Sequence, residues 1–231
     1  AYVSLDRPTQ AMGHLETTTG ASLARTYGTL STGVIDGSGI GIAILDSGMY
    51  ANHDSLSGQV VYQRDFTGEG RVDDPYGHGT FVAGVAAGSN NMAWGEYNGI
   101  APAAKLLNLR VLNGQGHGRS SDVIAGIDWC ISNQTTYNIR VINLSLGAIA
   151  VDSYVNDPLC RAVRRAVDAG IVVCVAAGNS GKDPDGNKIY GGVHSPAIEP
   201  SAITVGAANS FGTDIRSDDE VTTYSSRGPT R

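Results

Sequence analysis

The second half of the chain alternates short apolar runs with longer amphipathic segments, and this alternation constrains the fold more than any other feature. Apolar runs of strand length occur at 105–111, 141–146, 171–176 and 202–207. Segments with helical character lie between them at 122–133 and 158–169. Strands that alternate with helices favour a mostly parallel sheet with right-handed crossovers. The sequence therefore predicts an α/β fold, a doubly wound and mostly parallel sheet with helices on both faces.

The first half of the chain begins this pattern with a strand that ends at a carboxylate. Residues 41–45 carry no charge, and Asp46, Ser47 and Gly48 follow them directly. Such a run is typical of a buried parallel strand whose carboxyl end opens into a site. A second strand is predicted at 60–62. A helix rich in Ala and Gly is predicted at 79–87, and its small residues indicate close packing.

The length of 231 residues fits one domain of the larger α/β kind, which can bury a sizeable core. Residues 1–20 are polar and rich in Thr, so they predict an irregular amino-terminal arm, which we interpret as the end of a pro-region. Residues 21–231 form the predicted domain, with a short helix near 22–27. No linker or low-complexity tract divides it.

Composition argues against two classes of partner. A formal net charge of −6 and a pI near 5.2 argue against nucleic acid. No apolar run approaches the ~18 residues that a membrane helix needs. Three cysteines are too few for a disulfide framework. Cys174 lies in an apolar strand and is predicted to be buried and inert, whereas Cys130 and Cys160 lie on predicted helices and either pair or stay free.

Three polar residues are predicted to meet at one edge of this sheet. Asp46 follows one strand, His78 stands at the start of a helix, and Asn179 follows the strand at 171–176. Acyl transfer needs a carboxylate that orients a histidine, a histidine that moves the proton, and a donor for the oxyanion. Each residue alone has a plainer interpretation, with Asp46 as a turn or helix cap and Asn179 as a left-handed turn residue.

From about Gly39 onward, the motifs around these residues resemble those of the subtilisin-like (subtilase) serine peptidases. The matching motifs are Ile44-Leu45-Asp46-Ser47-Gly48, Gly77-His78-Gly79-Thr80 with Val82-Ala83-Gly84, and Ala176-Ala177-Gly178-Asn179-Ser180-Gly181. The resemblance implies a serine endopeptidase that hydrolyses peptide bonds through an acyl-enzyme. In such an enzyme Asp46 would orient the imidazole, His78 would act as general base and then acid, and Asn179 would donate to the oxyanion.

The resemblance also implies how a polypeptide substrate binds. Two backbone edges are expected to hold an extended peptide as a central strand, by β-augmentation. These edges are Ser145, Leu146 and Gly147 on one side and Gly116, His117 and Gly118 on the other. The other expected substrate-binding residues are Ala176, Ala177, Gly178 and His194. The family usually has a small residue at the position of His194, in the floor of the main specificity pocket.

One part of the family pattern is absent from this sequence. The family's nucleophile is a serine in a Gly-Thr-Ser-Met-Ala-like segment, and neither G-T-S nor G-x-S-x-G occurs here. We therefore expect the domain to lack its carboxyl-terminal part and the chain alone to be inactive. The expected partner is that segment or a second copy of the chain, covering strand faces that would otherwise be bare. The residues expected on those faces are Ile142, Leu144, Val173 and Val175.

Two alternative functions differ from an active peptidase. A catalytically dead relative that binds peptides is the alternative within the family. A nucleotide-binding domain is the alternative outside it, but the sequence has neither G-x-G-x-x-G after a strand nor a P-loop.

The predicted chemistry needs no cofactor, and the resemblance implies a secreted or extracytoplasmic location. Structural calcium is allowed by the acidic pairs Asp73-Asp74 and Asp183-Asp185. The family often places a calcium-binding Asp where this chain has Ser55. Hard cations need six to eight oxygen ligands, so the metal ligands stay unknown.

Overall fold

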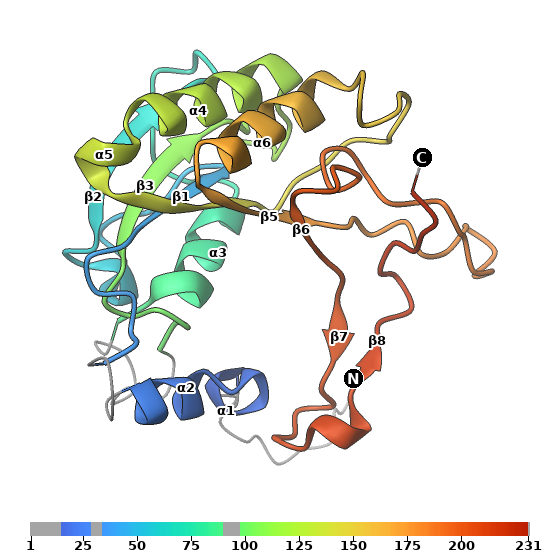
Figure 1. The fold of residues 1–231 in the computed structure, drawn as a ribbon, viewed down its shortest axis with the longest axis horizontal. Coiled ribbons are helices and arrows are strands. Elements are labelled where there is room, and N and C mark those ends of the chain that lie inside the picture. The colour runs from blue at the N-terminus through green and yellow to red at the C-terminus, as the bar shows by residue number, and fades with distance from the viewer. Residues whose placement is uncertain (1–14, 29–33, 90–97, 231) are drawn as a thin grey trace, which may run out of the picture.

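The computed structural model describes residues 15–28, 34–89 and 98–230. Within these ranges one sheet has the strand order β2-β3-β1-β4-β5-β6, and each neighbouring pair is parallel. Its strands are β1 (Gly41–Asp46), β2 (Val60–Asp65), β3 (Lys105–Arg110), β4 (Ile139–Leu144), β5 (Val172–Ala176) and β6 (Ile203–Val205). The predicted parallel α/β sheet is confirmed (Figure 1).

Helices cover both faces of this sheet, as predicted. Figure 1 shows α4, α5 and α6 on one face and α3 on the other. Their bounds are α3 (His78–Ala87), α4 (Ser120–Ser132), α5 (Gln134–Tyr137) and α6 (Pro158–Asp168). α4 and α6 pack against each other and over β1, β4 and β5, whereas α3 packs over β1 and β3. The fold is therefore doubly wound, with the sheet as the middle layer.

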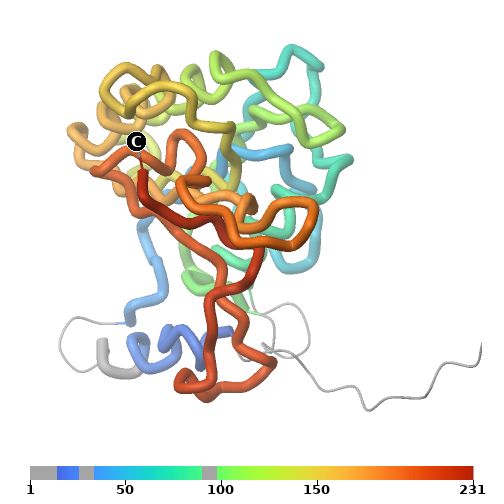
Figure 2. The backbone as a smooth tube through the Cα atoms, turned by 90° about the vertical axis from the view of Figure 1, so that its right-hand side faces the viewer, coloured from blue at the N-terminus to red at the C-terminus, as the bar shows by residue number. Residues whose placement is uncertain are grey.

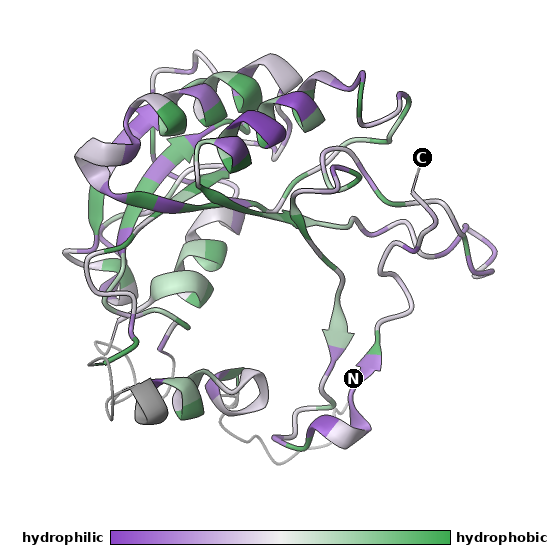
Figure 3. Ribbon diagram, in the orientation of Figure 1, coloured by the Kyte–Doolittle hydropathy of each residue, from purple (hydrophilic) through white to green (hydrophobic). Residues whose placement is uncertain are grey.

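Burial along the strands follows from this unequal cover. All six residues of β1 are buried because helices lie on both of its faces. β5 alternates between buried and partly exposed residues, the pattern of a strand with one covered face. Two apolar clusters result, one under α4 and α6 and one under α3. Figure 3 shows hydrophobic colour along the strands and stripes of both colours on α4 and α6.

The remaining elements belong neither to this sheet nor to the four helices above. They are α1 (Leu15–Thr19), α2 (Ala21–Gly28), the short helices η1 (Asp54–Leu56) and η3 (Arg216–Asp218), and the antiparallel pair β7 (Ala208–Asn209) and β8 (Glu220–Val221). α1 lies beside the segment that joins β7 to β8 in both views (Figures 1 and 2), and Arg216 Nε donates to the Thr18 carbonyl at 2.6 Å. No described helix is long and apolar enough to span a membrane.

Several local predictions were wrong. The arm at 1–20 is helical at Leu15–Thr19, while residues 1–14 lie outside the described part. Of the two alternatives left open for Cys130 and Cys160, the structure has the free thiols, each buried in the apolar cluster. Burial raises the pKa of Cys160 to about 12, which keeps it a thiol. Cys174 is only half-buried, since it lies on the face of β5 that none of the described helices covers. Burial nevertheless raises its pKa as well.

The prediction about uncovered strand faces was also wrong. The four residues expected to be bare are at most 1% exposed, because α4 and α6 cover them: Ile142, Leu144, Val173 and Val175. The opposite face is the uncovered one. Val172 of β5 is 46% exposed, and Ile203 and Val205 of β6 are 53% and 50% exposed. Successive side chains point to opposite faces of a strand, so the prediction assigned the uncovered face to the wrong one of the two alternating sets of residues.

Candidate active site

The strand order creates a crevice beside the carboxyl end of β1. The chain leaves β1 toward β2 on one side, whereas it leaves the neighbouring strand β4 toward β5 on the other. Ligand sites of open α/β sheets lie where the connections diverge in this way. Asp46 is the last residue of β1, and Ser145 follows β4 directly. Both predicted site residues therefore lie at this crevice.

Asp46 and His78 form a hydrogen-bonded pair there. Asp46 Oδ1 accepts from His78 Nδ1 at 2.8 Å and from the backbone N–H of Ser47 at 2.7 Å. The predicted separation of ~2.6 to 3.2 Å is thus confirmed. Asp46 is 1% exposed. Because a carboxylate accepts, Nδ1 carries the proton in the neutral ring, and Nε2 is left as the acceptor on the more exposed side.

His78 reaches Asp46 because α3 begins directly against the turn after β1. Gly77 precedes the helix in the left-handed region, with φ of 88°. A Cβ atom on Gly79 would lie 2.1 Å from the carbonyl oxygen of Gly48 and 3.1 Å from Asp46 Cβ. Only a glycine permits this approach. The small residues of the segment therefore set the distance between ring and carboxylate, as the sequence predicted for close packing.

The surroundings of His78 favour its protonated form. The hydrogen bond to Asp46 raises the pKa of His78 above the ordinary 6.5, partial burial opposes this, and the charges of Asp46 and Asp74 add to the increase. The ring is therefore a stronger base than a free histidine. A proton taken up at Nε2 would be stabilised by the buried carboxylate at Nδ1.

We expect the imidazole of His78 to titrate above pH 6.5. Asp46→Asn should lower this pKa, because the main cause of the increase disappears. Since the folded-state pKa is raised, the contribution of the pair to the free energy of unfolding is full at low pH. It is lost as pH rises through the folded pKa. NMR titration of ring-labelled histidines in the unmodified protein and in Asp46→Asn measures the shift. A His78 pKa that stays the same in Asp46→Asn would contradict the assignment.

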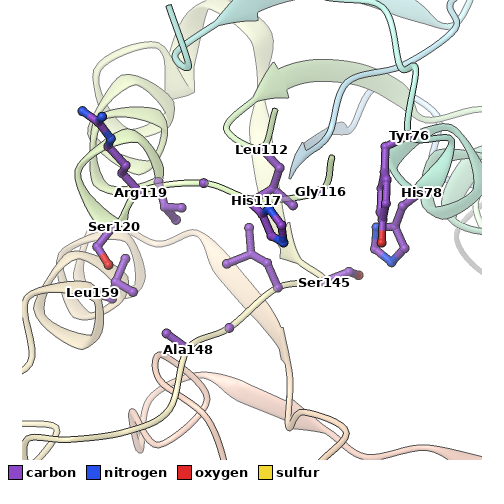
Figure 4. A pocket seen from close by; sticks show the side chains of 14 residues that line it. Tyr76, His78, Leu112, Gly116, His117, Arg119, Ser120, Ser145, Ala148 and Leu159 are labelled. Atoms are coloured by element: carbon purple, nitrogen blue, oxygen red, sulfur yellow. The ribbon is translucent and has the colours of Figure 1, made fainter. Parts of the chain in front are cut away.

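A groove of about 350 Å³ runs from His78 between two backbone segments (Figure 4). One segment carries Gly116, His117 and Gly118, and the other carries Ser145, Leu146 and Gly147. Figure 4 shows Tyr76 and His78 at one end and Ser120 and Leu159 at the other. The six backbone residues predicted to hold a peptide all line this groove, and an extended chain could lie between the two segments.

Asn179 lies in an adjoining pocket and not in the groove itself. Its side chain is exposed, and it lines this second pocket together with Ala176, Gly178 and Ser145. Ser145 lines both pockets, so the two meet at the carboxyl end of β4. Ala177 is buried and donates from its backbone to the Val205 carbonyl, which makes it a structural residue of this loop.

His194 lies between the loops that carry Gly147 and Gly178, two residues predicted to bind substrate. Its ring is so near Gly178 that a Cβ there would meet His194 Cγ at 2.8 Å, and a Cβ on Gly147 would meet His194 Cβ at 3.0 Å. Its Nε2 hydrogen-bonds with Ser180 Oγ at 2.9 Å. The loop is anchored below by buried Glu199, which pairs with Arg164 of α6. The histidine is thus held in place.

Several residues of this site were not predicted from the sequence. Those that line the groove are Tyr76, Leu112, Arg119, Ser120, Val123, Ala148 and Leu159. Tyr76 is the one that a sequence signal could have found, because it lies two residues before His78. Its ring centroid is 6.3 Å from that of His78. The other six are brought to the groove by the start of α4, the start of α6 and the loops after β3 and β4.

The acidic loops considered for calcium have other partners. Asp73 pairs with Arg71, and Asp183 accepts from the side chain and backbone of Asn187. Asp74 accepts hydrogen bonds from Ser47 and from the first turn of α3. Among the described residues no group of three or more His, Cys, Asp or Glu could hold a metal ion. These loops do not fit a calcium cage, and structural calcium stays a prediction.

Comparison with known proteins places the chain among peptidases. A model described as the subtilase family matches residues 37–231. The serine protease AprX of Bacillus subtilis (strain 168) is 40% identical over 236 residues, which cover 99% of this chain and 51% of AprX. Proteinase T of Parengyodontium album is 36% identical over 176 residues, 75% of this chain and 54% of that protein. The chain thus spans about half the length of these relatives.

Solved structures agree with this result. Sphericase superposes with a TM-score of 0.70 at 33% identity, and a psychrophilic protease, S41, with a TM-score of 0.71 at 32% identity. Each match covers 90% of this chain and 65% of the other.

Proposed function

This chain belongs to the subtilase family, and from that premise we propose that it is part of a serine endopeptidase that cleaves polypeptides through an acyl-enzyme. The observation that carries the proposal is the hydrogen bond of 2.8 Å between buried Asp46 and His78 at the head of a peptide-sized groove. A carboxylate that fixes the tautomer of a histidine is the arrangement that acyl transfer needs.

In the proposed reaction His78 Nε2 takes the proton of the nucleophilic hydroxyl and later gives it to the leaving amine. Asp46 stays ionised and stabilises the imidazolium through Nδ1. We assign the oxyanion donor to the side-chain amide of Asn179, because it is exposed in the pocket that adjoins the groove at Ser145. Base, orienting carboxylate and amide donor are all side chains, so we propose that the chemistry needs no cofactor.

The proposed substrate is an extended polypeptide, held as a strand between residues 116–118 and 145–147. Main-chain hydrogen bonds supply affinity in such a site, and pockets for alternate side chains supply preference. The shape of the groove supports this proposal, since two backbone segments flank it along its length (Figure 4). We propose no nucleic-acid or membrane partner. A secreted or extracytoplasmic location is proposed from the family resemblance, and fractionation of the source cells tests it.

We further propose that the 231-residue chain alone is inactive, because the nucleophile lies outside it. In the described residues no serine hydroxyl hydrogen-bonds to His78. The test uses the whole protein and the 231-residue chain side by side, with a peptide substrate and a serine-directed fluorophosphonate. We expect cleavage and labelling of the whole protein only. Labelling of a serine within the 231-residue chain alone would refute this assignment. Peptide binding without cleavage by the whole protein would favour the catalytically dead alternative.

His194 is expected to restrict the residue before the scissile bond. A ring held beside Gly147 and Gly178 shortens the pocket, so small or polar residues should be preferred over Phe and Leu. In the whole protein His194→Gly should raise kcat/KM for Phe and Leu relative to Ala by about tenfold or more. Cleavage of a peptide series measures it. Ser180→Ala, which removes only the hydrogen bond to the ring, is the control that should keep the preference. Unchanged selectivity in His194→Gly would count against this role.

The uncovered face of β5 and β6 is proposed to be covered by a further segment of the whole protein. Cys174 pairs with Ile203 and Ala176 with Val205, so one continuous apolar face is exposed. Relatives about twice as long as this chain support a segment of the same protein as the cover.

Ile203→Thr tests this cover. In the whole protein it should lower the free energy of unfolding by about 1.5 to 3 kcal/mol, because it would replace a buried side chain. In the 231-residue chain alone the effect should stay within about 0.5 kcal/mol. Thermal melts measure both, with native mass spectrometry to detect dimers. Equal effects in a monomeric chain and in the whole protein would argue against the cover.

A further inference from the structure

Asp74 is a half-buried carboxylate whose two oxygens are both fully engaged beside the catalytic pair. Its Oδ1 accepts from Ser47 Oγ at 2.7 Å and from the backbone N–H of Gly77 at 2.9 Å. Its Oδ2 accepts from the backbone N–H of Thr80 at 2.8 Å and from Thr80 Oγ1 at 2.7 Å. The four donors come from two separate parts of the fold, the turn after β1 and the beginning of α3.

These contacts replace the cap that α3 lacks. The N-cap residue is Gly77, which has no side chain to bind the first N–H groups of the helix. Asp74 accepts from the N–H groups of Gly77 and Thr80, and these two residues lie before and after His78 in the chain. A carboxylate at a helix N-terminus is also favoured by the helix dipole. The position of the first turn of α3 therefore depends on Asp74.

The same carboxylate reaches Asp46 through one buried residue. Ser47 donates from Oγ to Asp74, accepts at Oγ from the Gly79 N–H at 3.0 Å, and donates from its backbone N–H to Asp46. Its carbonyl accepts from Nε of buried Arg110 at 3.0 Å. Every polar atom of Ser47 is thus bound. Asp74 and Ser47 form a continuous bridge between the carboxylate of Asp46 and the backbone that carries His78.

We propose that Asp74 is a positioning residue for the Asp46–His78 pair, which holds the histidine ring and the orienting carboxylate at their hydrogen-bonding distance. This inference rests on the proposed peptidase function. Asp74 touches neither the substrate groove nor the reacting atoms, and it acts through Ser47 and through the first turn of α3.

The negative charge of Asp74 also favours the protonated form of His78, as the hydrogen bond to Asp46 does. Its field raises the pKa of His78, after the larger effect of Asp46. The other titratable groups that face the ring are Tyr76 in the preceding loop and His117 across the groove. The neighbouring Asp73 is exposed and paired with Arg71. Asp74 therefore differs from Asp73 both in its hydrogen bonds and in its effect on His78.

Asn does not replace Asp74 well, which makes Asp74→Asn an informative variant. An amide has one acceptor oxygen and one donor NH₂ group. One orientation would turn NH₂ toward the Gly77 N–H and the other toward the Thr80 N–H, so each would leave two donors facing each other. Asp73→Asn is the matched control, because it removes an equal charge one residue away and none of these contacts.

The experiment uses the whole protein and measures His78 directly as well as activity. In Asp74→Asn, NMR titration of ring-labelled histidine should show a lower His78 pKa, and kcat should fall on the order of 10- to 100-fold with KM changed less than twofold. Asp73→Asn should leave kcat and the His78 titration near those of the unmodified protein. In the Asp46→Asn background the additional loss from Asp74→Asn should be less than twofold, because the pair it positions is already broken.

Two outcomes separate this inference from the proposed function. A protein without peptidase activity whose His78 titration still responds to Asp74→Asn would end the proposed function and keep the positioning role. The positioning role would be overturned by an Asp74→Asn variant that melts cooperatively and has the same kcat and the same His78 pKa as Asp73→Asn. If Asp74→Asn does not fold, Ser47→Ala cuts the bridge and keeps the charge. It should then lower kcat while the His78 pKa stays raised, and an unchanged kcat would overturn the proposal.

Discussion

Asp46→Asn in the whole protein is expected to lower kcat by about four orders of magnitude, the loss known for the orienting aspartate of serine peptidase triads, subtilisin's included. The physical reason is the tautomer of His78. Asp46 Oδ1 accepts from Nδ1, which leaves Nε2 free to take a proton. An asparagine amide facing the ring would donate instead, and the proton would then lie on Nε2.

Steady-state cleavage of a peptide substrate measures this loss, and circular dichroism confirms that the variant is folded. Asp128→Asn, on the outer side of α4 and paired with exposed Arg165, is the control and should keep kcat unchanged. A loss below tenfold in Asp46→Asn would mean that Asp46 only caps the turn after β1.

The sequence was sufficient to predict that Asp46 and His78 meet, because the determinants of this pair are local. A strand that ends in Asp46 and a glycine-rich start of α3 each have a clear pattern, and a parallel sheet brings such ends to one edge. Asp74 escaped prediction because its role depends on two segments that meet only in the folded chain. In the sequence it is one of two adjacent acidic residues, and its neighbour Asp73 forms an exposed ion pair.

The hydrophobic pattern of a strand was insufficient to predict which face of the sheet the helices cover. In β4 and β5 both alternate sets of residues are largely apolar, so the sequence does not tell which set the helices cover. The structure assigns Ile142 and Val173 to the side of α4 and α6. The burial of Glu199 likewise depends on its ion pair with Arg164. From the helical pattern of the sequence alone, Arg164 would be expected on a solvent-exposed face.

Gly79→Ala is expected to damage both stability and activity, because the first turn of α3 lies directly against the turn after β1. The added Cβ would lie 2.1 Å from the Gly48 carbonyl oxygen, and a backbone atom yields less easily than a side chain. Overpacking of this kind costs about 1 to 3 kcal/mol, occasionally more. Because His78 is the preceding residue, a shift of the helix also displaces the ring from Asp46. A displacement of about 1 Å can cost on the order of 100-fold in rate.

Gly84→Ala is the matched control for this prediction, since it is the same substitution in the same helix. Among the described residues, a Cβ on Gly84 would meet only Ser55 Oγ, at 4.0 Å. It should therefore gain about 0.5 to 1 kcal/mol from the higher helix propensity of Ala. The two variants should shift the thermal midpoint in opposite directions, by about 2 to 4 °C per kcal/mol for a chain of this size. Only Gly79→Ala should also lower kcat, on the order of 100-fold. If both variants melted alike and kept full kcat, the contact between α3 and the turn after β1 would not set the geometry of the Asp46–His78 pair.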